Sequence, residues 1–289
     1  MAAFARAGSL RQEQSAAACI PYMAHVSDAV VTTSYGDYVQ VFQLAGASFE
    51  SADDEQLNAW HERLNVLLRN IASPQVALWT HVVRRRELTY PDRGAGEGFA
   101  ETLQAKYRQR LAGETLMVNE LYLSTVYRPS PGAATGLLSK VLSRAQRESS
   151  QLERGDALDA CEKLGETLQA SLARYEPEAL GVYRVQGRAF SRLLEFLGLL
   201  IAGESQRVPL PRAPLNEVLA TTRLCFGVEA IEYRLPTRTR VGAMLGIKEY
   251  PTPSTVGMFN ELLSAPFPFV LSQSFAFLTK AAGQALLQR

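Results

Sequence analysis

The sequence predicts an α/β fold of the mixed α+β kind, in which mixed sheets are covered by helices. Segments rich in β-branched and aromatic residues alternate with segments whose apolar residues recur at helical spacing, along most of the chain. With 289 residues, 47% of them hydrophobic, the chain is long enough for one large or two modest cores. We expect two α/β lobes, at residues 21–130 and 179–289, joined by a helical section at 131–178 and preceded by a disordered or extended segment at 1–20.

The first lobe is expected to begin with two strands, at residues 30–33 and 38–44, connected through Gly36. A helix should follow, because Ser51 and Asp54 have the spacing of a capping box. Its apolar face would consist of Leu57, Trp60, Leu64, Leu67, Leu68 and Ile71.

The lobe then continues as strand, helix, strand. Residues 76–83 alternate, which places Leu78 and Val82 on one side of a strand and Trp79 and His81 on the other. After a Gly-rich loop at 93–98, a second helix is marked on one side by Phe99, Leu103 and Tyr107. A fourth strand is expected at residues 117–127, and Pro129 should end it.

The helical section follows a turn at residues 129–135. One helix should start at Leu137, Leu138, Val141 and Leu142, and we expect Gly155 and Asp156 to break it. A second helix would be lined by Leu158, Cys161, Leu168 and Leu172.

The last third returns to strands and helices. Strands are expected at residues 181–185, 227–234, 240–248 and 269–277, and helices at 190–201 and 256–263. A final helix begins near Lys280 and reaches Arg289 without a Gly, Asn or Pro terminator, so we expect it to be truncated.

Composition and charge narrow the functional classes. Thirty basic residues against 29 acidic ones leave a net charge of +1, which gives no general attraction to nucleic acid or to anionic lipid. Cys19, Cys161 and Cys225 have neither disulfide-framework nor metal spacing, so we expect reduced cytosolic thiols. Residues 193–202 form the most apolar window, but they are about half as long as a membrane span and include Glu195. We therefore expect no membrane-spanning segment.

We expect no catalytic, cofactor-binding or metal-binding residue in this chain. The sequence has no P-loop, so the lysine and hydroxyl that hold phosphate and magnesium are missing. His25, His61 and His81 lie in no metal-ligand pattern. His25 with Asp28 could imitate a base and its orienting group, but no nucleophile is evident.

Positive charge is most concentrated in two arginine groups. They are Arg84, Arg85 and Arg86 at a strand end, and Arg234, Arg238 and Arg240 around a hairpin loop. They are typical of solvated strand ends. The functional alternative is partner docking, to an acidic protein surface, to lipid headgroups or to a nucleic-acid backbone. These six arginines are our candidate docking residues.

Five stretches resemble the amino-terminal region of the CagE/TrbE/VirB family of type IV secretion system ATPases. They are residues 20–26 (IPYMAHV), 76–85 (VALWTHVVRR), 119–129 (NELYLSTVYRP), 246–251 (GIKEYP) and 269–275 (FVLSQSF), in the family's order. The resemblance implies an α/β region that precedes a RecA-like domain carrying the Walker motifs. ATP and magnesium would bind only in that missing domain, and no catalytic residue transfers to this chain.

The resemblance also implies a role in assembly. In the family this region contacts small inner-membrane subunits and helps to build an oligomeric base, which would be hexameric in the full-length machine. The protein would be cytoplasmic and peripherally associated with the inner membrane through its partners. Two alternatives stay open: a nucleic-acid-contacting module of a DNA-transfer machine, and a small enzyme of another kind.

Overall fold

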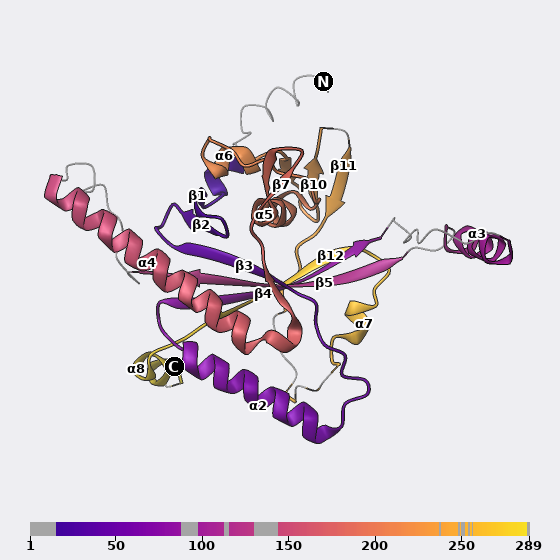
Figure 1. Cartoon of the computed structure of the whole chain (residues 1–289), viewed down its shortest axis with the longest axis horizontal. Helices are drawn as coiled ribbons and strands as arrows, with labels where there is room; N and C mark the ends of the chain where they lie inside the picture. Colours follow the sequence, from indigo (N-terminus) through magenta and orange to yellow (C-terminus); the bar gives the residue numbers. More distant parts are fainter. Residues whose placement is uncertain are drawn as a thin grey trace.

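The computed structural model describes residues 16–87, 98–112, 116–129 and 144–287, apart from residues 237, 248, 250, 251, 254 and 256. Its centre is a seven-stranded sheet in the order β1-β2-β3-β5-β4-β12, in which β3 also pairs with β6 (Figure 1). The strands are β1 (Tyr22–Ser27), β2 (Val30–Thr33), β3 (Tyr38–Leu44), β4 (Val76–Arg86), β5 (Met117–Tyr127), β6 (Pro177–Ala179) and β12 (Phe269–Ala276).

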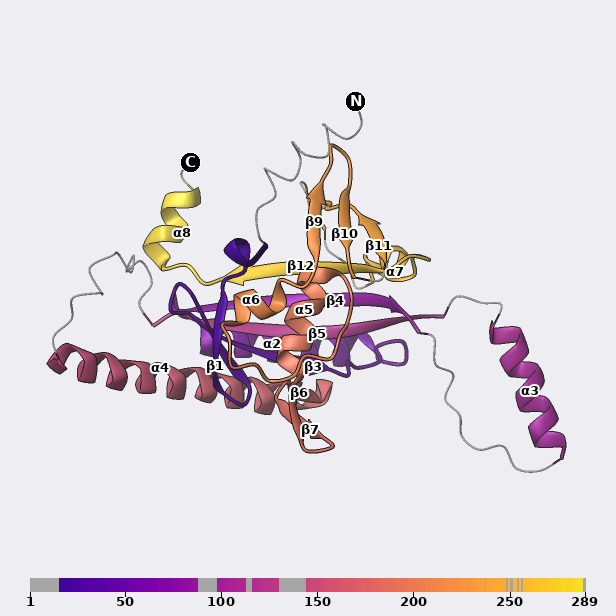
Figure 2. The same cartoon turned by 90° about the horizontal axis from the view of Figure 1, so that it is seen from above.

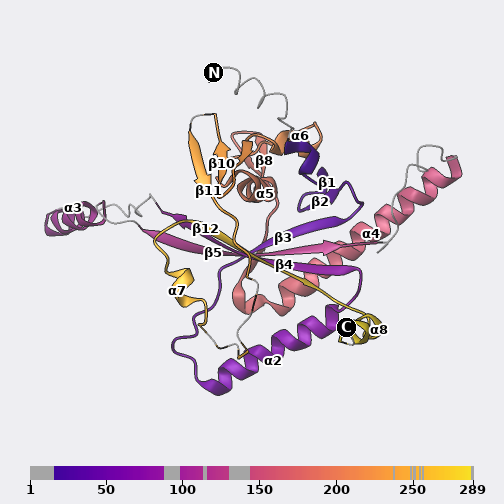
Figure 3. The ribbon, with the colours of Figure 1, turned by 180° about the vertical axis from the view of Figure 1, so that it is seen from behind.

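Helices cover both faces of this sheet (Figures 1 and 3). The long helices α2 (Asp54–Ile71) and α4 (Arg144–Ser171) lie on one face, while α5 (Arg192–Ala202) and α6 (Leu215–Leu219) lie on the other. The remaining helices are η1 (Ala16–Cys19), α3 (Phe99–Ala112), η3 (Ala173–Tyr175), α7 (Asn260–Leu263) and α8 (Lys280–Leu287).

The two faces of the sheet carry separate hydrophobic cores. Phe42 and Leu78 pack with Leu168 of α4 on one face. Val41 and Val83 pack with residues of α5 on the other. Successive residues of a strand point to opposite faces, and the strands obey this rule. The predicted sides of β4 are confirmed, because Leu78 lies in the first core and the His81 ring packs edge-on against Phe196 of α5.

The predicted α+β class is confirmed, but the strand directions differ from the expected mixed sheet. Every strand pair among the described residues is antiparallel. The reason is clearest at α3, which lies beyond the end of the sheet (Figure 2). The chain leaves β4, passes through α3 and returns as β5 beside β4, so this connection is an elongated hairpin and not a parallel crossover.

The two expected lobes share one sheet. β12, from the last third of the chain, pairs with β4 along its whole length, from Phe269 opposite Arg84 to Ala276 opposite Ala77. The sequence pattern defines β12 as a strand, but its neighbour is almost two hundred residues away in the chain. The rest of the last third forms a three-stranded sheet of β9 (Arg223–Phe226), β10 (Ile231–Arg234) and β11 (Thr239–Gly242), and a hairpin of β7 (Val182–Val185) and β8 (Arg188–Ser191).

Two expectations about where helices begin and end are wrong. The N-cap of α2 is Asp53 rather than Ser51, and its Oδ1 accepts a hydrogen bond of 2.8 Å from the backbone N–H of Gln56. The expected break at Gly155 is absent, because α4 runs through it without interruption. A helical glycine costs only about 1 kcal/mol relative to alanine, and burial of Cys161 and Leu168 outweighs that cost.

Three expectations concern residues outside the described part of the chain. They are the order of residues 1–15, the Gly-rich loop up to residue 97, and the turn and helix start between residues 130 and 143.

Candidate docking surface

A cleft of about 2450 Å³ lies on the face of the sheet that α5 covers. Its floor includes Trp79 of β4 and Ser272 of β12, and the β9–β11 sheet with the segment that follows it forms a wall. All six arginines that the sequence singled out line this cleft. The two groups are about 150 residues apart in the chain, and only the pairing of β12 with β4 and the docking of β9–β11 beside α5 bring them together.

Arg84 is buried, with only 8% of its surface exposed. Its Nε donates to the backbone carbonyl of Ala265 at 2.5 Å, and its Nη1 donates to Oδ1 of Asn119 at 2.9 Å. Asn119 in turn donates to the carbonyl of Leu263 at 3.1 Å. Arg84 therefore ties the segment after α7 to strands β4 and β5, which is a structural role.

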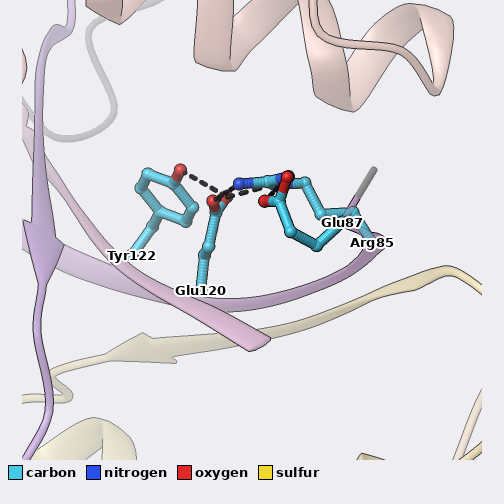
Figure 4. Close-up of polar contacts among 4 residues, drawn as sticks. All are labelled: Arg85, Glu87, Glu120 and Tyr122. Carbon is cyan, nitrogen blue, oxygen red and sulfur yellow. Dashed lines mark hydrogen bonds and ion pairs between the residues drawn. The ribbon is translucent and has the colours of Figure 1, made fainter. Parts of the chain in front are cut away.

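Arg85 lies in a network of carboxylates (Figure 4). Its Nε and Nη2 donate to Oε1 of Glu120 at 2.8 and 2.7 Å, and its Nη1 donates to Oε2 of Glu87 at 2.9 Å. The hydroxyl of Tyr122 donates to the other oxygen of Glu120 at 3.0 Å. The hydrogen bond with Glu120 raises the pKa of Arg85, so the guanidinium stays charged, but two carboxylates neutralise it.

Burial raises the pKa of Tyr122, and the nearby Glu120 carboxylate raises it further. The phenol therefore stays protonated and remains a donor to Glu120. Arg86 is the exposed member of the triplet. Its backbone pairs with Met117 of β5, but within the part of the chain that the structure describes its side chain makes no hydrogen bond or ion pair.

The second arginine group holds the β10–β11 hairpin against α5. Arg238 forms a two-pronged ion pair with Glu204, with its Nε 3.1 Å from Oε2 and its Nη2 on Oε1. Arg240 donates to the carbonyl of Gly203 at 2.9 Å and lies 4.0 Å from Glu204. A cation at the carboxyl end of α5 also interacts favourably with the helix dipole. Arg234 is paired with Glu232 at 2.8 Å.

Apolar side chains, which the sequence reasoning did not single out, occupy much of the cleft. Five of them are between 45% and 96% exposed: Phe226, Val241, Met244, Leu245 and Ile247. Their signal in the sequence is the run Ala243–Ile247, which has no polar residue yet fits no helix or strand of the structure. Exposed apolar groups rimmed by charges that are already paired are typical of a surface that binds another protein.

The ring of His25 hydrogen-bonds Ser191 and the backbone of Ser27, and not Asp28, which was the expected orienting group. Oγ of Ser191 lies 2.9 Å from Nε2 of His25, whose Nδ1 lies 3.2 Å from the carbonyl of Ser27. Ser191 is fully buried, however, and its Oγ accepts the backbone N–H of Leu194 as the N-cap of α5. Burial lowers the pKa of His25, so it is a neutral acceptor. The pair joins β1 to α5 and gives no substrate access to the hydroxyl.

The described residues contain neither a metal-binding cluster nor a membrane-spanning helix. No group of three or more His, Cys, Asp or Glu side chains in that part of the chain is placed to hold a metal ion. None of its helices combines the length and the apolar character needed to cross a bilayer.

Two protein-family models match this chain. The model described as "Type IV secretion system ATPase VirB4/TrbE, N-terminal domain" matches residues 29–134. The model described as "CagE, TrbE, VirB family, component of type IV transporter system" matches residues 178–289. Between them they cover α5, the β9–β11 sheet and the central sheet apart from β1 and the first residue of β6.

Curated relatives agree with these models. The chain is 37% identical over 272 residues to the type IV secretion system protein virB4 of Bartonella quintana, and this alignment covers 93% of the chain and 35% of that protein. It is 36% identical over 290 residues to virB4 of Brucella suis, covering 98% of the chain and 35% of that protein. It is 35% identical over 285 residues to PtlC of Bordetella pertussis, covering 96% and 34%. The chain thus spans about a third of the length of these relatives.

Proposed function

Because this chain belongs to the VirB4/TrbE branch of the CagE/TrbE/VirB family of type IV secretion system ATPases, we propose that it is a module through which such an ATPase assembles with its partner subunits. The observation that carries the proposal is the cleft beside α5, where exposed apolar side chains lie among arginines that are mostly paired within the chain. The partners would be the inner-membrane subunits of the secretion system and further copies of the ATPase in a hexamer. Membrane association would then be peripheral, on the cytoplasmic side, and mediated by these subunits.

The charge pairing favours a protein partner over nucleic acid. Binding to a phosphate backbone draws its free energy from cations that replace counterions. In the cleft, Glu120 and Glu87 already neutralise Arg85, Glu204 neutralises Arg238, and Glu232 neutralises Arg234. A nucleic acid would have to displace these carboxylates. The alternative, a nucleic-acid-contacting module, is favoured by one observation, namely that both arginine groups line the same cleft.

The proposal predicts that an acidic residue inside the cleft will weaken binding to detergent-solubilised inner-membrane subunits of the same secretion system. Changing Leu245→Asp places a charge on a side chain that is 96% exposed, so the fold should tolerate it while an apolar contact is lost. We expect about a tenfold or greater loss of affinity, which corresponds to about 1.4 kcal/mol. Isothermal titration calorimetry would measure it.

Val66→Asp is the matched control, since Val66 is 45% exposed on α2, on the opposite face of the sheet. Its affinity for the subunits should stay unchanged. Equal losses from both variants would place the docking surface elsewhere. Tight binding of single-stranded DNA, with a steep salt dependence and no binding of the subunits, would favour the nucleic-acid alternative.

We propose further that ATP and magnesium bind outside these 289 residues in the longer family members. The sequence lacks the P-loop lysine that holds the nucleotide phosphates. Titration of this chain with ATP and magnesium should therefore release no heat of binding, and micromolar binding would contradict the proposal.

A further inference from the structure

The central sheet has a free edge at β12. β12 ends the strand order, and its eight residues pair with β4 in one unbroken register. Among the described residues, none forms a backbone hydrogen bond with the opposite edge of β12. In an antiparallel ladder the backbone groups of alternate residues point away from the existing partner. About half of the N–H and C=O groups of β12 therefore face outward.

This edge lacks the features that normally prevent further strand pairing. Residues 269–276 (FVLSQSFA) include no charged residue and no proline, and their pairing with β4 has no bulge. The opposite edge of the sheet is protected in two ways. β1 has two register shifts against β2, between Tyr22 and Ala24 and between His25 and Ser27, and α6 packs against it. Because proteins usually block exposed edges by such means, an unblocked edge indicates a site for an added strand.

We propose that the free edge of β12 binds an extended segment of a partner protein, which joins the sheet as a further antiparallel or parallel strand. The inference rests on the proposed assembly function and specifies how one partner is held. The backbone of the segment would satisfy the outward N–H and C=O groups of β12, as in β-augmentation. The side chains of the segment would then supply specificity.

The geometry of β12 defines which side chains the segment needs. Val270, Ser272 and Ser274 stand opposite Val83, His81 and Trp79 on the cleft side of the sheet. The β9–β11 sheet stands beside β12 on the side away from β4, and it rises from the same face of the central sheet (Figures 1 and 2). A strand added at β12 would therefore place every second side chain in the cleft.

The occupants of these positions should be apolar. The cleft exposes Phe226, Val241 and Met244, which only apolar side chains complement without leaving polar groups unpaired. Arg86 lies two residues beyond the partner of Phe269 on β4, so a carboxylate near that end of the segment would complete the match. The partner is thus an extended segment with alternating apolar residues and an acidic end.

A second copy of the chain fits this edge less well. If two β12 strands paired across a two-fold axis perpendicular to the sheet, each would keep its own cleft-facing residues in the joint cleft. These residues include Ser272 and Ser274, and Ser272 already hydrogen-bonds His81 at 2.8 Å. Serine hydroxyls would then face the exposed apolar groups of the cleft. The apolar complement must come from a different sequence.

The test uses overlapping peptides of about 15 residues, long enough for one strand, that cover the cytoplasmic segments of the inner-membrane subunits. For a peptide that binds this chain, N-methylation of alternate residues should remove affinity in one register only. The register whose N–H groups face β12 is sensitive, and the register shifted by one residue faces away. Hydrogen exchange should slow in β12 when the peptide binds, at about half of its amides.

A variant of the chain provides the second measurement. Ser274→Lys introduces a charge in the middle of the edge at an exposed residue, and it should weaken peptide binding at least about tenfold. Asn70→Lys, at an exposed position near the end of α2, is the matched control and should bind as the unchanged chain does. Thermal unfolding of both variants would verify that the sheet remains intact.

The outcomes separate this inference from the proposed function. If the intact subunits bind but neither N-methylation nor Ser274→Lys changes the affinity, the proposed docking function is supported. The proposal that a partner strand joins the sheet at β12 is then wrong. If neither subunits nor peptides bind, both proposals fail. If the chain itself dimerises in light scattering and Ser274→Lys abolishes the dimer, the occupant of the edge is a second copy and the partner named here is wrong.

Discussion

At pH 5 the protein should be about 2 kcal/mol less stable toward unfolding than at pH 7, mainly because of His81. Its side chain is 6% exposed, its ring stacks on Trp79 and meets Phe196 edge-on, and burial lowers its pKa to about 4. In the unfolded chain the pKa of histidine is about 6.5. Between pH 6.5 and pH 4 the unfolded state therefore binds a proton that the folded state does not, so stability falls as the pH falls. Each pH unit in this window costs about 1.4 kcal/mol.

Urea unfolding at pH 7 and pH 5 would measure this difference. His81→Gln removes the titrating group and keeps a polar side chain that can reach Ser272, so most of the pH dependence should disappear in this variant. His25 has a smaller part, because burial lowers its pKa while the carbonyl of Ser27 and Asp28 oppose the shift. An unchanged pH dependence in His81→Gln would show that the pKa of His81 in the folded protein is close to its value in the unfolded chain, although the side chain is buried.

Local patterns in the sequence predicted much of the fold. The alternation in residues 76–83 assigned Leu78 and His81 to opposite faces, and the structure has them in separate cores. The helical periodicity that ends at Ile71 predicted α2, whose Leu67 and Ile71 are buried. Such patterns succeed because burial on one side of an element repeats at the period of that element.

Long-range pairing could not be predicted in the same way. Nothing in residues 269–276 specifies β4 as their neighbour, since any strand with an apolar face could pair with them. The cleft, and with it the meeting of the two arginine groups, depends on that pairing. The six arginines were therefore predicted as two separate groups, and the structure places both groups along one cleft.

Extending the strand alternation beyond Val83 would have predicted different roles for the three arginines of the triplet. The predicted strand ended at Val83, whereas β4 continues to Arg86. Alternation through these residues groups Arg85 with His81, and Arg84 with Leu78 and Val82, although all three arginines border the cleft at this end of the strand. Three consecutive arginines look alike in a sequence, but in a strand the middle one points away from its neighbours.

Arg84 and Arg86 should therefore respond very differently to substitution. Arg84→Met keeps an unbranched apolar stem but removes both hydrogen bonds, to the carbonyl of Ala265 and to Asn119. Hydrogen bonds from charged groups contribute about 1.5–3 kcal/mol each, and a buried acceptor left without its donor adds a desolvation cost. We expect the free energy of unfolding to fall by about 3 kcal/mol.

Arg86→Met, at the exposed end of β4, should change the free energy of unfolding by no more than about 0.5 kcal/mol. Urea unfolding at pH 7 measures both variants, at a pH where the histidine contribution is small. Arg84→Lys is the intermediate control, because an ammonium group retains the charge but cannot reach two acceptors with the planar geometry of a guanidinium. If Arg84→Met and Arg86→Met cost the same small amount, the Arg84 guanidinium does not hold the segment after α7. It would then be free to meet a partner, and the whole triplet would count as a docking patch.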